Sequence, residues 1–215
     1  MKAAVAMCSL AAAIAGAAQG SIVTFESVPE YSCPGYYTGS MEYVCPGKKE
    51  TFGTLTVTLN NTTAIKDGGW LTGFAFDIVP AVQLTYTAGL SGWSGMSDVN
   101  GTGFGQPYDF GAGVGGKFNG VPNNDVDLGI AAGSSGTFTF AVAGDAEALC
   151  KLTARDFFDD SKDYALVARF MKFNHGNDFG DSEDEGNAKI PAQAPAPGAL
   201  ALLALSGVAA RRRQR

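Results

Sequence analysis

The chain has little histidine, little charge and no C-terminal apolar run of ordinary membrane-spanning length. Its 215 residues include one histidine, His175, and only 17% of them are charged. Nucleophilic catalysis by Cys150 would have to use His175 as its base, because no other imidazole is present. The apolar run at residues 198–210 has 13 residues, whereas a helix that crosses a bilayer core needs roughly 20. The composition therefore argues against histidine-dependent chemistry and makes this run marginal as a permanent anchor.

Basic residues are scarce in the body of the chain as well. Five of the 15 basic residues lie close to the two ends, and the remaining 10 face 21 acidic residues, so the net charge of the body is −11. An acidic surface repels nucleic acid and anionic lipid, and we expect neither as a partner. Glycine is abundant, with 29 residues, about twice its usual share of roughly 7%. This mixture favours an all-β domain with long glycine-rich loops.

Residues 1–20 have the pattern of a secretory signal peptide. One positive charge, Lys2, precedes an apolar run, and small residues lie before Ser21. Cleavage is expected after Ala17, Ala18 or Gly20. Cys8 lies inside the apolar run without the context of a lipoprotein signal. The alternative is a buried N-terminal helix, and the near-total lack of polar residues argues against it.

Residues 190–215 form a second targeting segment. A Pro/Ala spacer precedes the 13-residue apolar run, and the chain ends in RRRQR. The terminal arginines favour the cytoplasmic side of a membrane, which makes the tail a stop-transfer segment with the body outside. The candidate motif residues are Pro195, Ala196, Pro197, Arg211, Arg212, Arg213 and Arg215.

This tail resembles the sorting signal of the bacterial PEP-CTERM proteins, in which a Pro-Glu-Pro-like motif precedes a short transmembrane helix and a basic cluster. Ala196 takes the place of the central Glu, so the motif is degenerate. The resemblance implies a sorting protease of the exosortase type as partner, transient membrane association, and a final location in the cell envelope, at the cell surface or in the extracellular matrix. A glycolipid-anchor signal is the alternative, but such signals end in their apolar run rather than in arginines.

Alternating apolar residues indicate several short strands between residues 21 and 189. The clearest run, residues 54–59, places Leu55, Val57 and Leu59 on one face. Similar runs occur at residues 21–25, 74–78, 82–86, 136–143 and 164–173, the last apolar on both faces as in a central strand. Thr153 and Asp156 have capping-box spacing, which predicts one short helix. We expect an all-β body of β-sandwich, jelly-roll-like architecture with one short helix, flanked by the signal helix and a single-span C-terminal helix.

Residues 89–120 are the main candidate for a binding loop. They contain 11 glycines, a density that predicts a long surface loop or a loose edge hairpin. Aromatic side chains within this segment could stack on sugar rings of a cell-surface polysaccharide, and Trp93 and Tyr108 are the candidate ligand-binding residues. The alternative is that these rings fold back over one face of the sheet.

Cysteines and acidic residues provide the remaining candidates. Cys33 and Cys45 share a Cys-Pro-Gly context and a short separation, which favours a disulfide between them in an oxidising compartment and leaves Cys150 unpaired. Two thiolates without a nearby histidine make a poor zinc site. No cofactor is expected, although Ca²⁺ is an alternative because acidic loops supply its oxygen ligands. The calcium candidates are Asp125, Asp127, Asp178 and Asp181.

No set of residues forms a recognisable catalytic group. We therefore expect a non-enzymatic, exported cell-surface or extracellular-matrix protein with three segments: a signal peptide (1–20), a β-sandwich body (21–189) and a sorting tail (190–215). A carbohydrate- or calcium-binding β-sandwich module is the alternative. A small hydrolase that uses paired carboxylates is the third hypothesis, but no carboxylates alternate along a strand as a cleft would require.

Overall fold

The structure is a computed structural model that describes residues 20–28, 35–47, 50–78, 82–104, 107–159, 164–174 and 188–194. Most of the signal peptide and the whole sorting motif lie outside these residues. So do Cys33, His175, Asp178 and Asp181. Among the described residues, no helix has both the length and the apolar character needed to cross a membrane.

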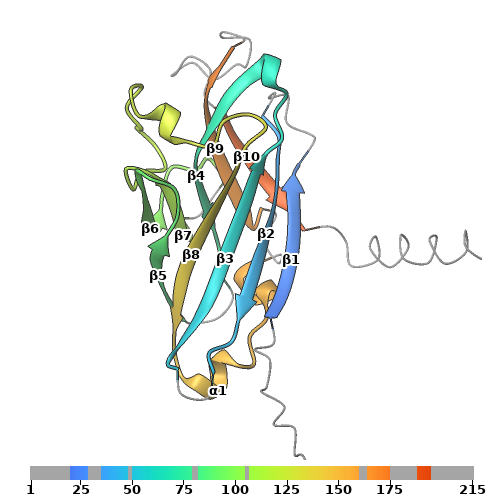
Figure 1. Ribbon diagram of the computed structural model, residues 1–215, viewed down its shortest axis with the longest axis vertical. Coiled ribbons are helices and arrows are strands. Elements are labelled where there is room, and N and C mark those ends of the chain that lie inside the picture. Colours follow the sequence, from blue (N-terminus) through green and yellow to red (C-terminus); the bar gives the residue numbers. More distant parts are fainter. Residues whose placement is uncertain are drawn as a thin grey trace, which may run out of the picture.

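Ten antiparallel strands form a single sheet in the order β5-β8-β3-β2-β1-β10-β9-β4-β7-β6. Figure 1 shows β5, β8, β3, β2 and β1 side by side across the front of an elongated body. The strands are β1 Gly20–Ser27, β2 Tyr37–Val44, β3 Phe52–Asn61, β4 Gly68–Phe76, β5 Gln83–Ala88, β6 Trp93–Val99, β7 Tyr108–Val114, β8 Ser135–Ala143, β9 Leu166–Phe173 and β10 Ala188–Gln193.

The sheet curls until it is nearly a barrel. Its two halves are joined at a narrow seam, where β1 and β10 pair only through Glu26–Gln193 and Ser27–Ala192. The two edge strands meet on the other side, because a Cβ on Gly95 in β6 would lie 2.4 Å from the Cβ of Tyr86 in β5. The expected all-β body is confirmed. The arrangement differs from two separate sheets, since the described strands form one continuous hydrogen-bonded sheet.

Alternation along the strands creates the core. Leu55, Val57 and Leu59 are fully buried, as the pattern of residues 54–59 predicts. Phe74 of β4 packs on Phe138 of β8 across the interior, with ring centroids 5.0 Å apart. The aromatic rings therefore hold the two halves of the sheet face to face, and each buried ring contributes roughly 2–3 kcal/mol of transfer free energy.

The second half of the sheet consists of β10, β9, β4, β7 and β6, and other parts of the chain cover its outer side. Strand β9 is buried on both faces, as expected for the two-sided run at residues 164–173. A small apolar cluster lies over β4, β7 and β9 and comprises Ala75, Val99, Tyr108, Phe118 and Val167. The glycine-rich segment 89–120 supplies part of this cover and includes the β6–β7 hairpin, in which β6 is an edge strand. The edge-hairpin alternative is therefore the correct one.

Helical structure in the described residues is limited to short turns. These are η1 Ile65–Asp67, η2 Val126–Leu128, α1 Ala146–Leu149 and η3 Ala154–Phe157. The predicted capping box is confirmed at η3, where Asp156 Oδ2 accepts a hydrogen bond from the Thr153 backbone N–H at 2.7 Å. Phe157 and Phe158 pack on Tyr43 and Phe25, so they fix η3 against β1 and β2.

The β body extends further than the sequence pattern predicts. β10 includes Ile190 and Gln193, which the sequence pattern assigns to the tail, and it pairs with β9. Ile190 is buried, and its carbonyl accepts a hydrogen bond from the Tyr37 hydroxyl at 2.8 Å. Burial raises the pKa of Tyr37 well above its ordinary value of 10.0, which keeps this donor protonated. The sheet therefore extends four residues past residue 189, to Gln193.

Candidate functional site

The outer face of the first half of the sheet is bare and rich in hydroxyl groups. Strands β8, β3, β2 and β1 bury alternate side chains, and β5 half-buries its own, so the remaining side chains of these strands point outward. We call this surface the hydroxyl face. Nine threonines and two serines lie on it: Thr24, Thr38, Thr54, Thr56, Thr58, Thr85, Thr87, Thr137, Thr139, Ser40 and Ser135.

Strand register arranges these groups in rows that cross the sheet. The first row runs through Thr24, Ser40, Thr58 and Thr137 on four adjacent strands. The second row runs through Glu26, Thr38, Asn60 and Ser135 on the same strands. Because neighbouring strands lie about 4.8 Å apart, each row spans roughly 14 Å. The face therefore presents a regular polar surface about the width of a short oligomer.

The second row is hydrogen-bonded from β8 as far as Thr38 in β2, and in the first row the Thr58 and Thr137 hydroxyl oxygens lie 3.4 Å apart. Near β8, Ser135 Oγ donates to Asn60 Oδ1 at 2.8 Å, and Asn60 Nδ2 donates to Thr38 Oγ1 at 3.3 Å. Near β1, Thr24, Ser40 and Glu26 make no side-chain hydrogen bond or ion pair to any residue that the structure describes. The β1–β2 end therefore offers polar groups that are open to a ligand.

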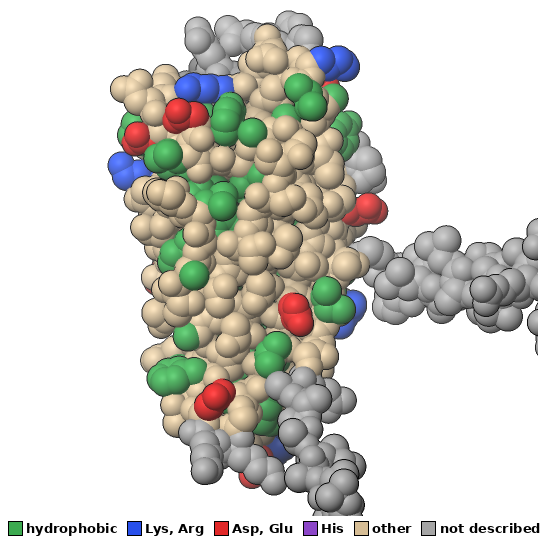
Figure 2. Space-filling model, in the orientation of Figure 1, with side chains coloured by type: hydrophobic (Ala, Val, Ile, Leu, Met, Phe, Trp, Pro, Cys, Tyr) green, Lys and Arg blue, Asp and Glu red, His purple; other side chains and the backbone are tan. Residues whose placement is uncertain are grey.

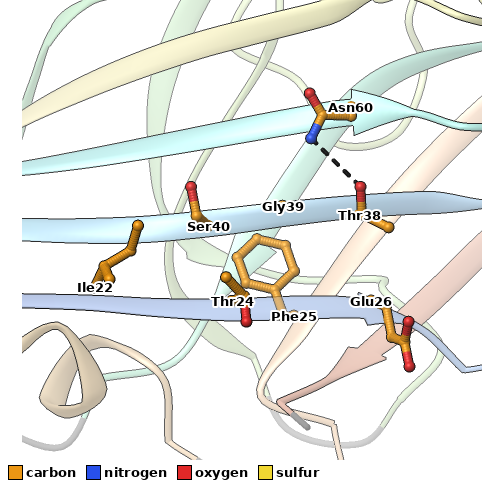
Figure 3. A pocket seen from close by; sticks show the side chains of 8 residues that line it. All are labelled: Ile22, Thr24, Phe25, Glu26, Thr38, Gly39, Ser40 and Asn60. Carbon is orange, nitrogen blue, oxygen red and sulfur yellow. Dashed lines mark hydrogen bonds between the residues drawn. The ribbon is translucent and has the colours of Figure 1, made fainter. Parts of the chain in front are cut away.

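A shallow hollow of about 410 Å³ lies at this open end (Figure 3). Its rim consists of Thr24 and Glu26 from β1, Thr38 and Ser40 from β2, and Asn60 from β3, together with the exposed side chain of Ile22. Its buried members, Phe25 and Gly39, form the floor. The Phe25 ring lies against the Gly39 backbone, since a Cβ on Gly39 would be 2.5 Å from that ring.

Charge is nearly absent from the hydroxyl face. Its outward-pointing strand residues include two carboxylates, Glu26 and Glu42, and no lysine or arginine. Figure 2 shows this side of the molecule, where the blue side chains lie only at the margins. The face is therefore weakly anionic and otherwise neutral.

The two aromatic candidates for sugar stacking are core residues. Trp93 is 6% exposed, its ring lies 4.5 Å from that of Phe138, and its indole N–H donates to the Leu128 carbonyl. Tyr108 is 2% exposed, and its hydroxyl donates to the Tyr164 carbonyl at 2.9 Å. Neither ring presents a face to solvent. These two rings therefore lie against the sheet, as the alternative predicts, and are not placed for stacking on a sugar.

Two of the four calcium candidates, Asp125 and Asp127, lie in the described part of the chain, at η2. Asp125 precedes η2 and Asp127 lies within it, and Asp127 is exposed. No group of three or more histidine, cysteine, aspartate or glutamate side chains with metal-binding geometry occurs within the described part of the chain. Within the described residues, Asp125 and Asp127 therefore have no third histidine, cysteine or acidic side chain that would complete a metal site with them.

The disulfide connects different cysteines from those expected. Cys45 is bonded to Cys150, with the two Cα atoms 5.0 Å apart and a sequence separation of 105 residues. Cys45 follows β2 and Cys150 follows α1, and the order β8-β3-β2 brings the ends of these segments together. The expected pairing of Cys33 with Cys45 is therefore wrong, and Cys150 is not a free thiol.

The apolar pattern of the strands reveals their inward positions, and the hydroxyl face is made of the outward ones. The signal was present, because Thr54, Thr56 and Thr58 alternate with the core residues of β3, and similar Thr-x-Thr pairs occur in β5 and β8. Strand order was needed to see that these pairs share one surface. Comparison of the chain with known protein families, with curated proteins and with solved structures finds no match.

Proposed function

We propose that this chain is an exported, non-enzymatic protein of the cell surface or extracellular matrix. The N-terminal signal would carry the β body out of the cytoplasm, and the PEP-CTERM-like tail would hold it at the membrane until a sorting protease of the exosortase type removes the tail. The mature β body would then be transferred to the cell surface or released into the matrix.

The observation that supports this proposal most directly is the Cys45–Cys150 disulfide. Disulfides form and persist mainly in oxidising compartments outside the cytoplasm. Closing a loop of this length would stabilise the folded state by roughly 4–5 kcal/mol on the chain-entropy account. Because the fold would lose this stabilisation if the bond were reduced, the disulfide favours a protein that works outside the reducing cytoplasm.

The bounds of the sheet also support it. β1 begins at Gly20, so cleavage after Ala17 or Ala18 would leave this strand complete. The Ser21 hydroxyl accepts a hydrogen bond from the Ala154 backbone N–H at 2.7 Å, which ties the start of β1 to η3. At the other end, β10 stops at Gln193, two residues before the candidate sorting motif. Cleavage after Ala17 or Ala18 and cleavage near Pro197 would therefore leave β1 and β10 complete, whereas cleavage after Gly20 would remove the first residue of β1.

We also propose that the body is a strongly curled sandwich of the jelly-roll kind. β3 pairs with β8, β4 pairs with β7, and β5 lies against β6, so the chain doubles back on itself in nested pairs. Such nesting is typical of jelly rolls, which combine two Greek keys.

The arginine cluster provides the test. Removal of residues 211–215 should release uncut precursor, because the positive charges keep the apolar run from being pulled through the membrane. A variant with lysine at the four arginine positions is the matched control, and it should be held and cut like the original chain. Fractionation and intact mass measurement in a host with the sorting enzyme distinguish these outcomes. Equal retention of the deletion variant and the original chain would contradict the stop-transfer role.

A further inference from the structure

We propose that the hollow at the β1–β2 end of the hydroxyl face binds a neutral polysaccharide. The inference deepens the proposed function, because it assigns a ligand class and a binding site to the exported body. The binding residues would be Thr24, Glu26, Thr38, Ser40 and Asn60, with Ile22 and Phe25 as the apolar contacts.

The open hydrogen-bonding groups match the chemistry of a sugar. Each sugar hydroxyl both donates and accepts, and the rim of the hollow contains hydroxyls, which do the same, beside a carboxylate that only accepts. Thr24, Ser40 and Glu26 have no described side-chain partner, so a ligand would not have to displace a bond within the protein. The Glu26 carboxylate would accept the strongest hydrogen bond, because bonds to charged groups exceed neutral ones.

Asn60 is held in position for such a contact. Its carbonyl oxygen accepts from Ser135, and its amide nitrogen donates to Thr38. This chain of bonds fixes the side chain along the second row before any ligand arrives, which lowers the entropy cost of binding. The fixed end of the rows would orient a polymer, and the open end would bind it.

Charge selects a neutral polymer over other partners. The hydroxyl face has two carboxylates and no cation among its outward strand residues, so it repels anionic polysaccharide, nucleic acid and anionic lipid. A protein interface of ordinary stability needs an apolar core, usually with aromatic residues. On the rim of the hollow, Ile22 is the exposed large apolar side chain, with 65% exposure. One aliphatic group suits the C–H face of a sugar ring better than a protein partner.

The test is affinity electrophoresis of the full-length chain in gels that contain dextran, a mixed-linkage β-glucan or galactomannan. We expect at least one of these neutral polymers to retard the protein and alginate, an anionic polymer, to leave it unretarded. The double variant Thr24→Val, Ser40→Ala removes two open hydroxyls and should weaken binding about tenfold. Glu26→Gln should weaken it as well, because the charged acceptor is lost.

The matched control is the double variant Thr54→Val, Thr85→Val, which removes two exposed hydroxyls from the same face outside the hollow. It should bind as well as the original chain. Absence of retardation in all three neutral gels, equal loss of binding in the two double variants, or preference for alginate would each overturn the proposal. The binding test requires no export or processing, so its failure leaves the proposed location standing and a location failure leaves the binding result standing.

Discussion

At the residue scale, the contact between Gly39 and the Phe25 ring forms the floor of the hollow. Gly39 has no side chain on the inner face of β2, and Phe25 from β1 occupies the vacated space. The Thr58 backbone oxygen closes the same space from β3, at 2.5 Å from an added Cβ. Since a backbone atom cannot move aside as easily as a side chain can, any larger residue at this position would strain the core.

We therefore expect Gly39→Ala to destabilise the fold by about 2 kcal/mol, the cost of forcing a methyl group into a filled core. Gly47→Ala is the matched control, because an added Cβ there meets no atom within 4 Å. Urea unfolding of both variants provides the measurement. Equal midpoints for Gly39→Ala and the original chain would show that Phe25 and β3 can relax at little cost.

At the element scale, sequence patterns predicted the strands with clear alternation and missed those without it. Leu55, Val57 and Leu59 mark β3 because one face is buried and the other is polar. The bounds of β6 and β7 within the expected edge hairpin could not be predicted because glycine hides their alternation, and β10 was missed because Pro191 makes it resemble a spacer. The hydroxyl face could not be found from one strand, since it depends on the order of five strands.

The length of β10 can be tested by truncation. A chain that ends at Lys189 loses the buried side chain of Ile190 and leaves the Tyr37 hydroxyl without its acceptor. These two losses together should cost about 4 kcal/mol of unfolding free energy. A chain that ends at Ala194 keeps both contacts and should match the full-length chain in urea unfolding. Equal stability of the two truncated chains would contradict the assignment of β10 to the core.

The disulfide was mispredicted because sequence proximity was used in place of strand order. Cys33 and Cys45 are 12 residues apart, but β2 lies beside β3 and β3 beside β8, which places Cys45 next to Cys150. Peptide mapping without reduction should therefore recover a Cys45–Cys150 link. The Cys45→Ser, Cys150→Ser double variant should lose about 4 kcal/mol of stability. Recovery of a Cys33–Cys45 peptide would contradict this topology.

At the scale of the whole molecule, the end of the sheet and the apolar run are close in sequence. Four residues separate Gln193 from residue 198, and an extended chain covers at most about 3.6 Å per residue. Five Cα–Cα steps join Gln193 to residue 198, so the proposed account keeps the end of β10 within roughly 18 Å of the start of the apolar run until the tail is cut. The hydroxyl face includes Glu26, which pairs with Gln193, so its open end lies beside the point where the tail leaves the sheet.

The central claim is that the mature protein consists of the β body without its two targeting segments. Intact mass measurement of the protein recovered from the surface or medium of its native host tests this claim most directly. The account predicts a chain that begins between Ala18 and Ser21 and ends near Pro197, with the Cys45–Cys150 bond intact. A membrane-bound chain that still runs from Met1 to Arg215 would contradict it.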